Sequence, residues 1–111
     1  MNVEIAADSG IHTFKVTGDV DLKTSPQLRE KLQTVLKTKP KGILIDMNAC
    51  PYIDSSGIAT LVEALQGLRS SGGRMAIAGT AQRVRDIFEI AHLDGIFPMF
   101  ATVEEALNSL K

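Results

Sequence analysis

The chain has 111 residues, of which 44% are hydrophobic and 23% are charged, a composition typical of a folded globular domain. Its 12 basic and 13 acidic residues leave a formal charge of −1, so we expect no direct binding to nucleic acid. A single cysteine, Cys50, excludes an internal disulfide, and the apolar runs fall far short of the ~20 residues of a membrane helix. The first residues also lack the basic and apolar regions of a signal peptide. These features favour a cytoplasmic protein without membrane insertion.

The first third of the chain predicts two strands and a helix. Alternating apolar residues at positions 3–5 and 12–16 lie on either side of Gly10, which is typical of a β-hairpin. Ser25 followed by Pro26 is a helix-start signal. The apolar residues that follow recur on one face of the predicted helix: Leu28, Leu32, Val35 and Leu36.

The middle of the chain predicts a buried strand and a second helix. Residues 43–47 form a nearly continuous apolar run, as expected of a strand covered on both faces. After Pro51 the apolar residues return with helical spacing, and residues 70–73 (SSGG) end that helix. The apolar stripe consists of Ile58, Leu61, Val62, Leu65 and Leu68.

The last third predicts a strand at 74–79, a helix at 84–91, a strand at 96–100 and a final helix that residues 102–105 open with a capping-box pattern. Pro98 cannot donate a ladder hydrogen bond, so the last strand belongs at a sheet border. The order of elements predicts an α/β fold with a mixed central sheet of about five strands and right-handed crossovers. Four helices are expected to pack mainly on one face of that sheet.

Polar residues lie where the predicted central strand leads into the second helix, at Asp54, Ser55, Ser56 and Gly57. Unpaired backbone donors and the positive end of the helix dipole meet at such a place. Taken alone, the pattern favours a structural interpretation in which a serine caps the helix. A functional interpretation gains support because open α/β sheets place functional loops at the carboxyl ends of central strands. Ser55 also precedes the first periodic residue, Ile58, by three positions, so its hydroxyl should point outward.

Residues 52–58, with the sequence YIDSSGI, closely resemble the signature of anti-sigma factor antagonists in the STAS family. Residues 18–21 (GDVD) resemble the family's Gly-acid-apolar-Asp turn, and the glycines at 72–73 precede a strand as in the family. The likeness covers nearly the entire chain and implies a single STAS domain over residues 1–111. Asp19 stands where many members carry Glu, and Ile53 where Met is frequent.

The resemblance implies a phosphorylation switch. In the family, the first serine after the motif aspartate is phosphorylated by a partner that is both a protein kinase and an anti-sigma factor, which makes Ser55 the expected acceptor and Ser56 a structural neighbour. The unmodified form would bind this GHKL-type serine kinase and free a sigma factor, and a PP2C-type phosphatase would reset phospho-Ser55. Asp21 and Asp54 match acidic positions of the partner-facing surface, which we expect to include Ser55, Ser56 and Gly57. A monomer or weak dimer is expected.

Enzymatic readings are poorly supported by the residues. A hydrolase elbow would read Gly-x-Ser-x-Gly, but Ile53 occupies the first glycine position, and only His12 and His92 could act as the base. The glycines at 72–73 fit neither dinucleotide nor Walker motifs. We therefore expect no catalysis, cofactor or metal. The competing hypothesis is a STAS scaffold, such as a subunit of a lipid-transport or stress complex, that uses the same helix start only for docking and is not phosphorylated.

Overall fold

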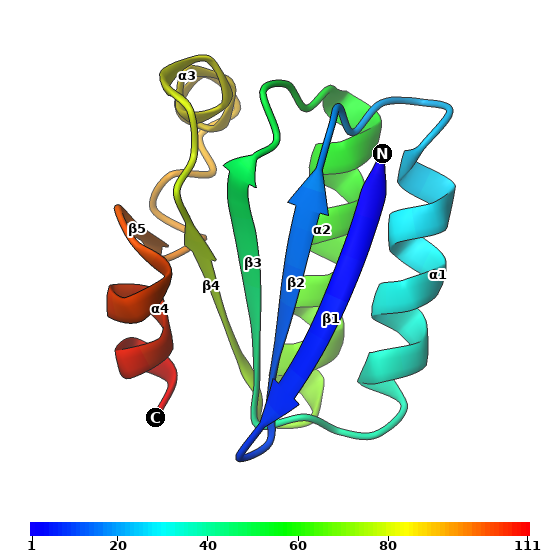
Figure 1. Ribbon diagram of the computed structural model, residues 1–111, viewed down its shortest axis with the longest axis vertical. Coiled ribbons are helices and arrows are strands. Elements are labelled where there is room, and N and C mark those ends of the chain that lie inside the picture. Colours follow the sequence, from blue (N-terminus) through cyan, green and yellow to red (C-terminus); the bar gives the residue numbers. More distant parts are fainter.

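Five strands form one mixed sheet, in the order β1-β2-β3-β4-β5, in the computed structural model, which describes residues 1–111 (Figure 1). The first two strands, β1 (Asn2–Asp8) and β2 (Ile11–Thr17), form the predicted antiparallel hairpin. The remaining strands, β3 (Gly42–Ala49), β4 (Arg74–Ala78) and β5 (Met99–Phe100), are parallel to β2. The carboxyl ends of β2, β3 and β4 therefore lie at the same end of the sheet.

The four helices are α1 (Ser25–Leu36), α2 (Ser55–Ser70), α3 (Gln82–Ile90) and α4 (Val103–Leu110). Figure 1 shows α1 and α2 side by side on one face of the sheet, α3 at the end where β4 leaves it, and α4 on the opposite face. The predicted α/β fold with a five-stranded mixed sheet and four helices is confirmed.

Side-chain alternation along the strands divides the core in two. Ile43 and Ile45 of β3 belong to a cluster of 22 buried residues that includes side chains of α1, α2 and α3, whereas Leu44 belongs to a cluster of six with α4. Successive residues of a strand point to opposite faces, so the continuous apolar run in β3 serves both clusters. Three of the four helices contribute to the larger cluster, so most helical packing lies on one face of the sheet.

The last strand is shorter than the predicted 96–100. Ile96 and Phe97 lie in a turn, where their backbone N–H groups donate to the carbonyl oxygen of Leu93 at 3.0 and 3.1 Å. Phe97 is fully buried and packs edge-to-face on Phe88, with ring centroids 5.5 Å apart. The apolar character of this segment therefore comes from its insertion into the core under α3, and only Met99–Phe100 pairs with β4.

Candidate functional site

The loop between β3 and α2 ends on Asp54, which caps the helix. Oδ1 of Asp54 accepts hydrogen bonds from the backbone N–H of Ser56 at 2.9 Å and of Gly57 at 3.2 Å. These bonds satisfy two of the backbone donors that every helix start leaves without an internal partner. The local sequence therefore begins α2 at Ser55, three residues before the first residue of its apolar stripe.

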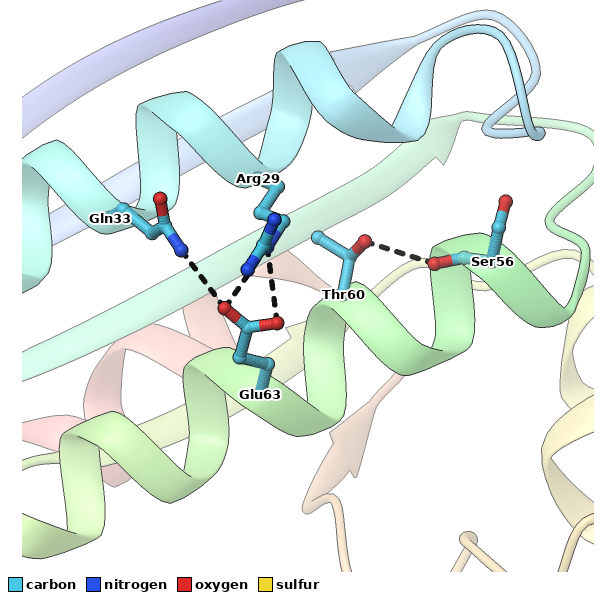
Figure 2. Close-up of polar contacts among 5 residues, drawn as sticks. All are labelled: Arg29, Gln33, Ser56, Thr60 and Glu63. Atoms are coloured by element: carbon cyan, nitrogen blue, oxygen red, sulfur yellow. Dashed lines mark hydrogen bonds and ion pairs between the residues drawn. The ribbon is translucent and has the colours of Figure 1, made fainter.

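Ser56 is tied into the same cap. Its Oγ donates to Oδ1 of Asp54 at 2.5 Å. Its carbonyl oxygen accepts from Oγ1 of Thr60 at 2.9 Å, one turn further along the helix (Figure 2). Thr60 is itself buried. The hydroxyl and the carbonyl oxygen of Ser56 thus both stabilise the first turn of α2, which is a structural role.

Ser55 differs from its neighbour in every one of these respects. It is exposed as the first residue of α2, and no hydrogen bond within the chain engages its hydroxyl, whereas that of Ser56 is bound to Asp54. The positive end of the helix dipole lies at this position and favours negative charge. A second protein can therefore reach the Ser55 hydroxyl.

The carboxyl group of Asp54 has a pKa below its ordinary value of 3.8. The main cause is the hydrogen bond from the Ser56 hydroxyl; partial burial acts in the opposite direction, and the backbone N–H groups of Gly57, Ser56 and Leu22 lower the pKa further. Asp54 is consequently ionised at neutral pH. The surface beside Ser55 carries a fixed negative charge.

A second loop, residues 18–24, lies against the first through main-chain contacts. The N–H of Val20 donates to the carbonyl oxygen of Tyr52 at 3.0 Å, and the N–H of Asp54 donates to that of Val20 at 3.0 Å. These bonds form a short parallel bridge between Val20 and Ile53. They bring the loop that contains Asp21 next to the start of α2, so two of the acidic residues identified from the sequence belong to adjoining loops.

The carboxylate of Asp21 organises its own loop. Its Oδ1 accepts from the N–H groups of Lys23 at 3.0 Å and Thr24 at 3.1 Å, and from Oγ1 of Thr24 at 3.1 Å. The backbone N–H of Asp21 in turn donates to Oγ1 of Thr24 at 2.8 Å. Thr24 directly precedes α1, so this network fixes the entry to that helix. Oδ2 of Asp21 takes part in none of these bonds.

Gly57 is buried beneath the two loops. A Cβ at this position would lie 2.5 Å from Cγ1 of Ile53 and 2.7 Å from Cγ1 of Val20, the two residues of the bridge. Such distances are far inside van der Waals contact. The absence of a side chain at Gly57 therefore allows the two loops to pack directly against the start of α2.

A polar contact joins the two helices that follow these loops. Nε of Arg29 on α1 lies 3.0 and 3.1 Å from the two carboxylate oxygens of Glu63 on α2, and Nε2 of Gln33 donates to Oε1 of Glu63 at 2.9 Å (Figure 2). The hydrogen bonds from Arg29 and then Gln33 hold the pKa of Glu63 below its ordinary value. The contact links α1, which follows the Asp21 loop, to α2, which begins at Ser55.

Sequence reasoning missed two further residues at this edge of the molecule. The side chain of Leu22 is 77% exposed, although its backbone N–H faces the Asp54 carboxylate. The guanidinium of Arg83, at the start of α3, lies 5.9 Å from the centre of the Tyr52 ring. An apolar residue within a charged turn is the signal that could have revealed Leu22. No local pattern pairs Arg83 with Tyr52, since only the folded sheet brings them together.

The fold does not bring together the side chains that a metal site or a serine–histidine pair would need. Nowhere do three His, Cys, Asp or Glu side chains converge as a metal ion would require. His12 pairs with Ile43 at the opposite end of β3 from the site, and neither His12 nor His92 hydrogen-bonds to Ser55. None of the four helices combines the length and apolar character that a membrane crossing requires.

Residues 2–106 match the sequence model of the STAS domain, and the chain belongs to that family. The anti-sigma-B factor antagonist of Staphylococcus aureus is 28% identical over 93 residues, which make up 84% of this chain and 86% of that protein. The family expected from the YIDSSGI segment is therefore confirmed.

Solved structures of the Bacillus protein SpoIIAA have the same fold. Its unphosphorylated form, described as an anti-sigma factor antagonist, superimposes with a TM-score of 0.87 at 22% identity, covering 98% of this chain and 96% of that one. Its phosphorylated form superimposes with a TM-score of 0.80 at 21% identity, covering 99% and 100%.

Proposed function

We propose that this chain is an anti-sigma factor antagonist that is switched by phosphorylation of Ser55. The unmodified form binds a GHKL-type serine kinase that is also an anti-sigma factor, and this binding releases a sigma factor. A PP2C-type phosphatase restores the unmodified form. The chain acts in the cytoplasm as one STAS domain over residues 1–111, as a binding protein and not as an enzyme.

One observation carries the proposal: the Ser55 hydroxyl is exposed and unbonded at the start of α2, while the neighbouring Ser56 hydroxyl is held by Asp54. A kinase that docks at the start of α2 would find one serine hydroxyl free to accept a phosphate. The names of the relatives support the proposal, because the Staphylococcus aureus protein is an anti-sigma-B factor antagonist and SpoIIAA has been solved with and without phosphate.

The charge of the site explains why modification would end binding. Asp54 is ionised and Asp21 retains a carboxylate oxygen outside its loop network, so a matching partner would present basic groups to these two side chains and a hydrogen-bond acceptor, such as a carboxylate, to the neutral Ser55 hydroxyl. A phosphate adds about −1.5 to −2 charges. Two like charges ~4 Å apart cost about 4 kcal/mol at an effective dielectric constant near 20, and about 1.4 kcal/mol is a tenfold change in affinity. One phosphate placed against an acidic group of the partner can thus weaken a complex by two to three orders of magnitude.

The covalent step is tested by mass spectrometry of the protein purified from its native host. We expect a phosphate on Ser55 and none on Ser56. Protein that never acquires a phosphate on Ser55, under growth and stress conditions alike, would instead support the scaffold hypothesis.

The binding step is tested by pull-down and titration with the GHKL-type kinase of the same host. Ser55→Ala should bind like the unmodified protein, and Ser55→Asp should bind at least tenfold more weakly, because the added charge faces the partner. Ser70→Asp is the matched control, since it adds the same charge at the other end of α2. Equal affinities of the Ser55→Ala and Ser55→Asp variants for the kinase would contradict the proposal.

A further inference from the structure

The two edges of the sheet are protected very differently. β5 has two residues and directly follows Pro98, so it offers almost no backbone for pairing. β1 is the strand at the opposite border of the sheet (Figure 1). It has seven residues in unbroken register with β2, contains neither proline nor lysine, and is exposed at every position except Val3. Natural proteins rarely leave so long and regular an edge open, because its unpaired N–H and C=O groups are a template for another strand.

We propose that two copies of this chain associate through β1, with the two strands antiparallel and Ile5 of one copy opposite Ile5 of the other. The result is a two-fold symmetric dimer with one continuous sheet of ten strands. The inference rests on the edge of the sheet alone and is independent of the function of Ser55.

The charges on β1 select this register. When both copies keep their helices on the same side of the joined sheet, pairing centred on Ile5 places Glu4 opposite Ala6 and Asn2 opposite Asp8. Centring the pair on Glu4 would set two glutamates against each other, and centring it on Ala6 would set Glu4 against Asp8. Like charges directly opposite destabilise a sheet, so only the Ile5-centred register uses all seven residues without such a pair.

The surroundings of Ile5 fit the same arrangement. Ile5 is 41% exposed although it lies on the helix-covered side of the sheet, at the margin of a groove of about 430 Å³ between β1 and α1. The α1 residues of that groove are Gln27, Glu30, Lys31, Thr34 and Val35. A second Ile5 in cross-strand contact would cover the first, and Glu30 and Lys31 supply both signs of charge to a surface that meets its own copy.

Sedimentation velocity of the full chain, from about 1 μM to about 1 mM, tests association. We expect the dimer fraction to rise with concentration in the wild type, and the dissociation constant of Ile5→Lys to increase at least tenfold, because a lysine at the centre of the edge opposes pairing. Ile90→Lys is the matched control, as Ile90 is 78% exposed on α3 and should leave the dimer unchanged. A monomer at every concentration, or equal association of Ile5→Lys and wild type, would overturn the proposal.

Cysteine cross-linking tests the register. Residues directly opposite in antiparallel strands lie about 4.5–5.5 Å apart between Cα atoms, within the range of a disulfide, so Ile5→Cys should form a covalent dimer under mild oxidation. Ala7→Cys lies on the same face, but the two copies of position 7 would be four residues apart along the strands, or about 13 Å, and should not cross-link. The wild type, whose Cys50 is buried, provides the background. No covalent dimer for Ile5→Cys, or equal yields for both variants, would refute this register.

Discussion

The hydroxyl of Ser56 donates a 2.5 Å hydrogen bond to Oδ1 of Asp54, and this bond is the largest cause of the lowered pKa of that carboxyl. Two adjacent serines therefore differ sharply in availability, because one hydroxyl is held by the helix cap and the other is free. This difference is set by the chain itself, before any partner arrives, and it makes the following outcomes testable on the isolated protein.

Ser56→Ala should raise the pKa of Asp54 toward 3.8 and change how stability depends on pH. Because the folded-state pKa of Asp54 is lowered, its contribution to stability is present above about 3.8 and is lost as the pH falls through the folded-state value. Wild-type stability should therefore fall more steeply with acid in this window than that of Ser56→Ala, with Ser70→Ala as the control. Thermal unfolding from neutral pH to pH 2–4 measures both slopes, and equal slopes would show that Ser56 does not tune the carboxyl.

Asp54→Ala should lower the free energy of unfolding by about 1 kcal/mol, because it leaves two backbone donors at the start of α2 without a partner. Asp54→Ser retains a capping oxygen and should recover most of that loss. Urea denaturation of the three proteins at neutral pH is the measurement. If the serine variant is as unstable as the alanine variant, capping is not the reason.

Gly57→Ala should destabilise the protein by roughly 1–3 kcal/mol, since the new methyl group must displace the buried side chains of Ile53 and Val20. Gly67→Ala in the same helix is the matched control. There the nearest atom is the flexible Cδ1 of Leu36 at 3.2 Å, and the gain in helix propensity, up to about 1 kcal/mol, should leave stability equal or higher. Calorimetric unfolding measures the stability of both variants. Similar losses of stability in the two would mean that Ile53 and Val20 move aside from the new methyl group at little cost.

His92→Gly should stabilise the protein by about 0.5 kcal/mol. His92 follows α3 with φ of 59°, in the left-handed region, which costs a side-chain-bearing residue about 1–2 kcal/mol, partly offset by the greater freedom of glycine in the unfolded chain. Ala91→Gly, where φ is −81°, should instead lose stability. Opposite signs in the two melting-temperature shifts are the expected result, and a loss in both variants would argue that His92 makes a compensating contact.

Much of this architecture was predictable from periodicity and helix-start signals. The apolar run at 43–47 indicated a buried strand, and Ser25–Pro26 marked the start of α1 correctly. The last strand was predicted too long because an apolar residue such as Phe97 reads alike in a strand and in a turn that inserts into the core. The helix predicted at 84–91 ends at Ile90 in the structure, and His92 follows in the left-handed conformation that often terminates a helix.

The candidate site was predictable only in its local part. Asp and Ser at a helix start follow from capping chemistry, so the exposed position of Ser55 could be inferred from neighbouring residues, although the residue that caps the helix is Asp54 and not the expected serine. The bridge between Val20 and Ile53 could not, because it joins segments more than thirty residues apart through backbone atoms that carry no sequence signal. Leu22, which follows Val20 by two residues and is 77% exposed, was missed as well.

The bridge between Val20 and Ile53 joins the two loops by main-chain atoms. The geometry of the surface that these loops form with the start of α2 therefore does not depend on which side chains face outward from it. Outward residues such as Leu22 are thereby free to diverge while the turn that carries Ser55 keeps its shape. Under the proposed function, changes at a few surface positions would insulate the signalling pathways of several such domains in one bacterium, and the proposed switch at Ser55 would stay unaltered.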